Sequence, residues 1–269
     1  MRLLAKLSTP LLAVSLLSGQ VNPRVWRLIG PDARAITGVN LDRYRQTALS
    51  ESRSTALNLP FGATGGQAIS ISGDPKTHRA PLEIIIGDKR PPQLENSQPF
   101  PMLDANTAIL GDEDGMREAA GRWNGDAPLS DLAARVRKLA ESYDAWILVV
   151  KPLDNLDDGL PVPASKYRSE VVRVVEEIAA GIRFGPFYEV RIDVLARTSE
   201  DAYSLAALGR WLPGLIQTTD PRGTQSRILD LAENLAVQVA GRTVTLSLGI
   251  PEHKLADLLR SLHKEDEGQ

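Results

Sequence analysis

Two stretches near the end of the chain alternate apolar and polar residues with a period of two. The first runs from about residue 178 to residue 196, and the second from residue 235 to residue 250. Such alternation is typical of β-strands that bury one face and expose the other. We therefore expect two β-hairpins in the last third of the chain.

The turn of the second hairpin sets its register. If Gly241-Arg242 forms a two-residue loop, Val239 lies opposite Val244 and Val237 lies opposite Leu246. All the apolar residues then share one face, and glycine at the first loop position suits a tight hairpin turn. A slip of one residue would turn half of these side chains to solvent. The alternation therefore predicts this register and no other.

The first hairpin is predicted by the same test. A three-residue loop, Gly185-Pro186-Phe187, places Ile182 opposite Val190, whereas a two-residue loop would place Ile182 opposite a glutamate. The other face of this hairpin then carries charged side chains, which are Arg183, Glu189, Arg191 and Asp193. A charged face exposed to solvent indicates a sheet that helices cover on one side only.

Helical patterns follow both hairpins. Thr198, with Asp201 three residues later, resembles a capping box at the start of a helix. We expect this helix to end at Pro213-Gly214. Pro251 suits the first turn of a closing helix, whose apolar positions are Leu255, Leu258, Leu259 and Leu262. The predicted fold class is α+β: a two-layer sandwich with an antiparallel sheet, helices on one face, and the order β-β-α-β-β-α in the C-terminal half.

The first half of the chain shows shorter patterns. We expect strands near residues 32–39, 67–71, 82–86 and 107–110, and helices at 41–48, from Asp112 and from Ser130. Ala145–Val150 is a continuous apolar run, which predicts a central strand covered on both faces. Residues 169–177 fit a helix by the spacing of their valines and a strand by residue type.

The ends and the middle of the chain suggest its division. Residues 1–20 have a basic start followed by a short apolar run, as in a secretory signal peptide. The alternative is an N-terminal helix of a cytoplasmic protein, and an uncleaved signal would tether the protein to the membrane. A linker rich in proline and aspartate is expected at 152–165. It separates an N-terminal α+β half (21–151) from a C-terminal α+β half (166–263), and a charged tail (264–269) follows.

Composition narrows the functional classes. The 269 residues include no cysteine, which excludes thiol catalysis, disulfide bonds and a lipoprotein anchor on cysteine. The formal charge of −3 gives no electrostatic footprint for nucleic acid. A cysteine-free protein with a signal peptide and a core of this size is expected in the bacterial periplasm or outside the cell.

Candidate metal and cofactor motifs each have a simpler explanation. The acidic loop at 111–115 complements the dipole of the helix that follows, and the aspartates at 154–158 do not match the calcium-loop template. The glycines at 62–66 lack the Lys-Ser/Thr pair of a phosphate-binding loop. His78, His253 and His263 have no ligand partner at helical spacing. We therefore expect no cofactor and no metal.

Two places on the chain remain as contact sites. Trp26 lies near the predicted mature N-terminus, where a ligand or partner could reach it. The charged face of the first hairpin, with Arg183, Glu189, Arg191 and Asp193, is our candidate contact surface. The alternative for these four residues is ordinary solvation with pairing of charges across the strands.

Several segments together resemble a loose group of predicted exported bacterial proteins with no assigned activity. They are residues 31–40 (PDARAITGVN), 108–112 (AILGD) and 144–148 (DAWIL), together with the hairpin-helix-hairpin end. The resemblance implies an envelope protein of unknown function and gives no catalytic residue. We expect a non-enzymatic module that binds an unknown protein or envelope ligand, without a transmembrane span once the signal is removed. The alternative is a periplasmic hydrolase with a site built from scattered carboxylates.

Overall fold

The computed structural model describes residues 21–47, 50, 65–73, 79–87, 101–151, 172–219 and 234–255, and for 211–219 it describes the backbone alone. The predicted signal peptide, the linker at 152–165 and the charged tail lie outside the described residues, as does the predicted closing helix beyond Leu255.

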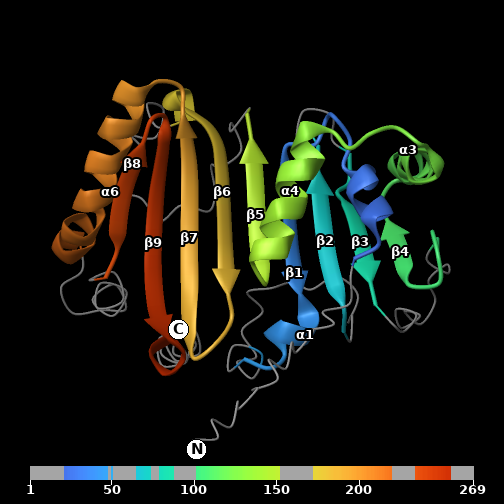
Figure 1. The fold of residues 1–269 in the computed structure, drawn as a ribbon, viewed down its shortest axis with the longest axis horizontal. Helices are drawn as coiled ribbons and strands as arrows, with labels where there is room; N and C mark the ends of the chain where they lie inside the picture. The colour runs from blue at the N-terminus through green and yellow to red at the C-terminus, as the bar shows by residue number, and fades with distance from the viewer. Residues whose placement is uncertain are drawn as a thin grey trace, which may run out of the picture.

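Within the described residues, nine antiparallel strands form one sheet in the order β4-β3-β2-β1-β5-β6-β7-β9-β8 (Figure 1). The strands are β1 (Ala35–Asn40), β2 (Gln67–Ser72), β3 (Leu82–Ile86), β4 (Thr107–Leu110), β5 (Ala145–Val150), β6 (Val175–Arg183), β7 (Phe187–Ala196), β8 (Ala236–Ala240) and β9 (Thr243–Pro251). The α+β class with an antiparallel sheet is thus confirmed. The apolar run at 145–150 is the fifth strand of nine, so its predicted central place is also confirmed.

Both predicted hairpin registers are confirmed. Val237 pairs with Leu246 and Val239 with Val244, and Gly241 has the positive φ of +57° that a tight turn requires. In the first hairpin Ile182 pairs with Val190. The stretch 169–177 was predicted to be either a helix or a strand. Within its described part, residues 172–174 form a helical turn and the strand β6 begins at Val175.

Five helices are described: η1 (Pro23–Leu28), α1 (Leu41–Tyr44), α3 (Glu113–Asn124), α4 (Asp131–Ser142) and α6 (Ser199–Thr219). The predicted starts of α3 and α4 are confirmed, because Asp112 and Ser130 accept hydrogen bonds from the backbone N–H groups three residues later. Thr198 caps the next helix, α6, in the same way. The predicted end at Pro213-Gly214 is wrong, since α6 continues to Thr219. Proline disfavours the interior of a helix but does not prohibit it.

Helices cover opposite faces of the sheet in its two halves. On one face α3, α4 and η1 bury a core that includes Ile36, Trp146 and Leu148, and Figure 1 shows α4 crossing in front of β1 and β5. On the other face α6 packs against Val237 and Val244. Successive residues of a strand point to opposite faces, so the α4 side of β6, β7 and β9 carries their polar residues. We call it the polar side of the sheet.

Candidate functional site

The structure brings the four predicted contact residues together on the polar side of the sheet. Arg183 at the end of β6 pairs in register with Glu189 on β7, and Arg191 and Asp193 follow on β7 at alternate positions. Figure 1 shows that, of the helices the structure describes, none lies in front of β7 and β9 on this side, whereas α4 borders it beyond β6. We call these four residues the charged patch.

Arg183 is held in place by three different groups. Its Nη1 lies 3.0 Å from Glu189 Oε2, and its Nε donates to the Ser142 carbonyl at 2.8 Å. Its guanidinium carbon lies 5.4 Å from the ring centroid of Tyr143, a cation–π contact. Tyr143 itself lies on Gly181, where an added Cβ would stand 2.2 Å from Tyr143 Cγ. The end of α4 and the sheet therefore fix this guanidinium together.

Arg191 and Asp193 form a second unit. Arg191 makes two parallel hydrogen bonds to the Asp193 carboxylate, at 2.9 Å from Nε and 3.1 Å from Nη2. The hydrogen bonds to Asp193 raise the pKa of Arg191 above its ordinary value. Thr245 on the adjacent strand β9 donates to Asp193 Oδ1 at 2.5 Å. Planar bidentate pairs of this kind are geometrically specific, so this part of the patch is preorganised.

The arrangement limits what the charged patch can do. Each arginine is paired with a carboxylate within the patch, so its two positive and two negative groups cancel. A neutral surface does not attract a polyanion from a distance. It does offer fixed donors and acceptors, including the Glu189 and Asp193 carboxylates and the Thr245 hydroxyl. Thr245 and Tyr143 were missed in the sequence because neither belongs to the first hairpin.

The face opposite the charged patch is apolar. Here Ile178, Ile182, Val190, Ile192, Leu246 and Leu248 are all half-buried. One end of this face packs against α6 through Val194 and Val244. The other end packs against Tyr188, Ile250 and Leu255. We call this surface the apolar side of the sheet.

Glu83 on β3 is a half-buried carboxyl group with a hydroxyl partner. Ser70 on β2, its partner in register, donates to Glu83 Oε1 at 2.7 Å. Burial raises the pKa of Glu83 above its ordinary value, and the Ser70 hydrogen bond opposes that rise. A carboxyl group with a raised pKa can serve as a general acid or base. In the sequence, Ser70 and Glu83 were only parts of two predicted strands.

The buried hydroxyl of Tyr188 links the end of β7 to the residues that follow β9. Tyr188 is almost fully buried, and its hydroxyl bonds with Glu252 Oε1 at 3.0 Å. Burial is the main cause that raises the pKa of Tyr188 to about 12, and Glu252 adds to it while a hydrogen bond with Thr47 opposes it. A phenol with so high a pKa stays protonated at neutral pH, which suits an anchoring role.

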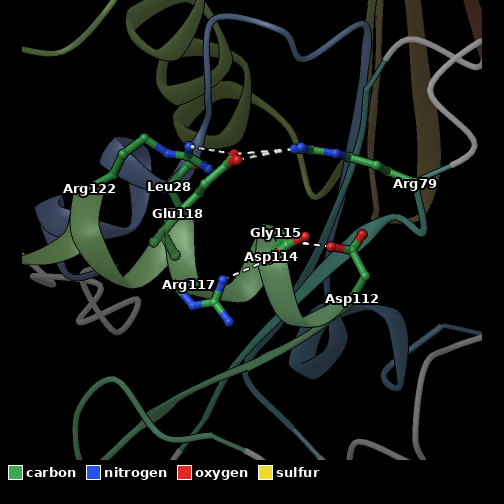
Figure 2. A network of polar contacts seen from close by, with 8 residues as sticks. All are labelled: Leu28, Arg79, Asp112, Asp114, Gly115, Arg117, Glu118 and Arg122. Carbon is green, nitrogen blue, oxygen red and sulfur yellow. Dashed lines mark hydrogen bonds and ion pairs between the residues drawn. The ribbon is translucent and has the colours of Figure 1, made fainter.

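The acidic loop at 111–115 is a helix cap, as expected. Figure 2 shows Asp112 bonded to Gly115, where its Oδ1 accepts from the backbone N–H at 2.7 Å. Farther along α3, Glu118 lies 3.3 Å from Arg79 and 3.9 Å from Arg122, whose Nη2 donates to the Leu28 carbonyl. Within the part of the chain that the structure describes, no group of three or more His, Cys, Asp or Glu residues could hold a metal ion.

The expectation for Trp26 is wrong. Its side chain is only 3% exposed and belongs to the main core with Trp123 and Trp146, so no partner reaches it. The short helix η1, which begins just after residue 21, turns Trp26 inward against α3 and α4. Of the three histidines, His253 lies among the described residues, and it is exposed at the start of the closing helix.

Comparisons with known proteins give structural similarity that is weak. No protein-family model and no curated protein matches the chain. Among solved structures, the chain is similar to one described as crystal form I of TP0453, with a TM-score of 0.43 and 9% identity, covering 91% of this chain and 99% of that one. Over the described residues, no helix is both long and apolar enough to cross a membrane.

Proposed function

We propose that this protein is an exported, non-enzymatic binding module whose contact surface is the charged patch on β6 and β7. The observation that carries the proposal is the gathering of Arg183, Glu189, Arg191 and Asp193 on a side of the sheet that α4 leaves uncovered.

The geometry of the patch favours binding over mere solvation. Isolated surface ion pairs usually contribute little to stability, typically about 0–1 kcal/mol. Here Arg183 is also fixed by Tyr143 and by a backbone carbonyl, and Asp193 by Thr245. Side chains that are already ordered lose less conformational entropy when a partner binds.

The chemistry of the patch suggests the kind of partner. Because its charges cancel, a complementary partner presents both donors and acceptors in a fixed pattern, as a protein or an envelope ligand does. Strong dependence on salt is not expected, since few counterions would be released.

The test compares partner capture by three forms of the mature protein. Alanine at all four patch positions should abolish capture of an envelope partner that the wild type retains. The control replaces Glu113, Asp114 and Arg117 with alanine, because these residues also form exposed ion pairs, but on α3. Capture that survives the patch variant, or that is lost equally in the control, would contradict the proposal.

A hydrolase is the second candidate, and Glu83 is the observation that favours it. The half-buried carboxyl group and the Ser70 hydroxyl lie 2.7 Å apart, and burial raises the pKa of Glu83. A broad screen of ester, amide and glycoside substrates is the test, with Glu83→Gln as the matched variant. Turnover that disappears in Glu83→Gln would favour the hydrolase and refute the non-enzymatic proposal.

Export itself is tested separately. Residues 1–20 support it through their basic start and short apolar run. N-terminal sequencing of protein recovered from the cell envelope should find a start near residue 20. An intact Met1 on envelope protein would favour the retained tether, and recovery only from the cytoplasm would contradict export.

A further inference from the structure

An exposed aromatic ring lies at one end of the charged patch. Phe187 is the first residue of β7, and its side chain is 62% exposed. Tyr188, the next residue, is buried on the apolar side of the sheet, and successive residues of a strand point to opposite faces. Phe187 therefore shares the polar side with Glu189, two residues farther along β7. Of the large hydrophobic side chains that are exposed in the described residues, Phe187 is the one that lies on this part of the sheet.

The surface beside this ring is low and open. Gly249 on β9 pairs in register with Glu189, and an added Cβ at Gly249 would meet nothing within 4 Å. Ser247 and Thr245 precede Gly249 on β9 at alternate positions, so they face the same side. The exposed residues of β8 on this side are Ala236, Gln238 and Ala240. Mostly short side chains therefore form a flat floor next to the taller side chains of β7, and a ligand can approach the strands closely there.

The polar groups beside this floor suit a ligand rich in hydroxyl groups. Each carboxylate of the charged patch is paired with a guanidinium, Glu189 with Arg183 and Asp193 with Arg191. A hydroxyl group both donates and accepts hydrogen bonds. Neighbouring hydroxyls of one sugar ring can therefore donate to the carboxylate and accept from the guanidinium of the same pair. The faces of sugar rings also carry C–H groups, which pack on the electron-rich face of an aromatic ring such as Phe187.

Two other classes of partner fit this surface less well. A polyanion is attracted by a net positive surface, whereas the charges of the patch cancel. A protein partner is usually anchored by large side chains buried near the centre of the interface. Here the exposed ring of Phe187 lies at one end, about 20 Å of strand from Asp193. The centre, at Arg191, is polar.

We propose that the partner of the charged patch is a neutral glycan, which lies along β7 and β9 with one sugar ring packed on Phe187. The Arg191–Asp193 pair and the Glu189 carboxylate bind its hydroxyl groups, and the floor at Gly249 leaves room for its chain. This inference rests on the proposed function, because it names the chemical class that the same surface binds.

Calorimetric titration of the full chain with neutral oligosaccharides tests the proposal. The panel contains oligomers of glucose, mannose, galactose and N-acetylglucosamine, and at least one of them should bind. Phe187→Ala should weaken that binding by about tenfold, because the contact with the ring is lost. The control is Tyr203→Ala, which should leave the affinity unchanged. Tyr203 is 66% exposed, as Phe187 is, but it lies on α6, which packs on the apolar side of the sheet.

Three titration results would overturn the glycan assignment. They are binding to no member of the panel, unchanged affinity in Phe187→Ala, and an equal loss of affinity in Tyr203→Ala.

A second readout separates a glycan from a protein partner. Envelope material from the cells that make this protein is treated either with periodate, which cleaves vicinal diols, or with a protease. Capture of this material by the protein should be lost after periodate and survive the protease. The reverse result would mean that the partner is a protein, and it would overturn the assignment.

Failure of the glycan assignment is distinguishable from failure of the proposed function. If the glycan tests fail while alanine at all four patch positions still abolishes capture, the binding module stands and its partner is of another class. If the four-alanine variant leaves capture unchanged, both the proposed function and the glycan assignment fail.

Discussion

Single residues in this fold are constrained where an aromatic ring lies directly on the backbone of an adjacent strand. Gly38 on β1 pairs with Trp146 on β5, and an added Cβ at Gly38 would stand 2.2 Å from Trp146 Cζ2. Trp146 is only 7% exposed and belongs to the main core, so it cannot easily move aside. Glycine is therefore required at position 38 for close packing.

The first prediction follows from this packing. Gly38→Ala should lower the free energy of unfolding by about 1–3 kcal/mol, because the new methyl group overpacks the core. The control is Gly121→Ala, since a Cβ at this helical position meets nothing within 4 Å. That variant should gain up to about 1 kcal/mol from helix propensity. Urea denaturation measures both, and a Gly38→Ala protein as stable as the wild type would contradict the packing.

Glu83 gives a prediction about pH. Its pKa in the folded protein is raised above the ordinary value of 4.5 by burial. Below that ordinary value the group is protonated in both the folded and unfolded states, and it adds no pH dependence. As the pH rises through the raised folded pKa, the folded state must ionise a half-buried group, and stability is lost.

Glu83→Gln removes this ionisation while keeping the shape of the side chain and an acceptor for Ser70. The variant should therefore gain stability relative to the wild type as the pH rises from 4 toward 7. Denaturation midpoints of the two proteins across this range provide the measurement. A constant difference between them would show that Glu83 has the same pKa in the folded and unfolded states.

Helices and hairpins show which features local sequence can predict. The hairpin registers were predictable because the turn residues and the alternation of adjacent strands leave one pairing that buries every apolar residue. The helix starts at Asp112, Ser130 and Thr198 were predictable because a cap acts over three residues. The end of α6 was not, since Pro213-Gly214 is a common stop signal for a helix, yet α6 continues through it to Thr219.

The cap of α4 provides a prediction at this scale. Ser130 Oγ accepts from the Ala133 N–H at 3.1 Å, and Ser130→Ala should cost about 1 kcal/mol of stability. Ser142→Ala is the control, because Ser142 lies at the opposite end of the same helix, where its hydroxyl donates to the Lys138 carbonyl at 2.7 Å and caps no N–H group. Thermal denaturation compares the two. Equal losses of stability in the two variants would show that the Ser130 cap does not specifically stabilise α4.

The whole molecule is organised by one sheet that both halves of the chain share. Strand β5 from the first half pairs with β1 on one side and with β6 from the second half on the other. The sequence indicated the strands of each half but not the pairing of β5 with β1 and β6, because the paired strands are far apart in the chain. For the same reason, it predicted the charged patch within one hairpin but missed the contributions of Tyr143 and Thr245.

A shared sheet implies that the two halves unfold together. Leu148 on β5 is 1% exposed, and Leu148→Ala should lower stability by about 2–5 kcal/mol. Tryptophan fluorescence and far-UV circular dichroism should report one coincident, shifted transition. The control is Leu208→Ala on α6, which is 38% exposed and should change little. Two separate transitions would mean that the halves are independent.

Strand β7 separates a charged, open side of the sheet from an apolar side that is more covered. Single cysteines at positions 191, 192, 193 and 194 of the otherwise cysteine-free chain can be labelled with a water-soluble thiol reagent, and their rates compared. Positions 191 and 193 should react fast and positions 192 and 194 slowly, in strict alternation. Similar rates at all four positions, or fast labelling at 192 and 194, would show that β7 does not separate the two sides in this way.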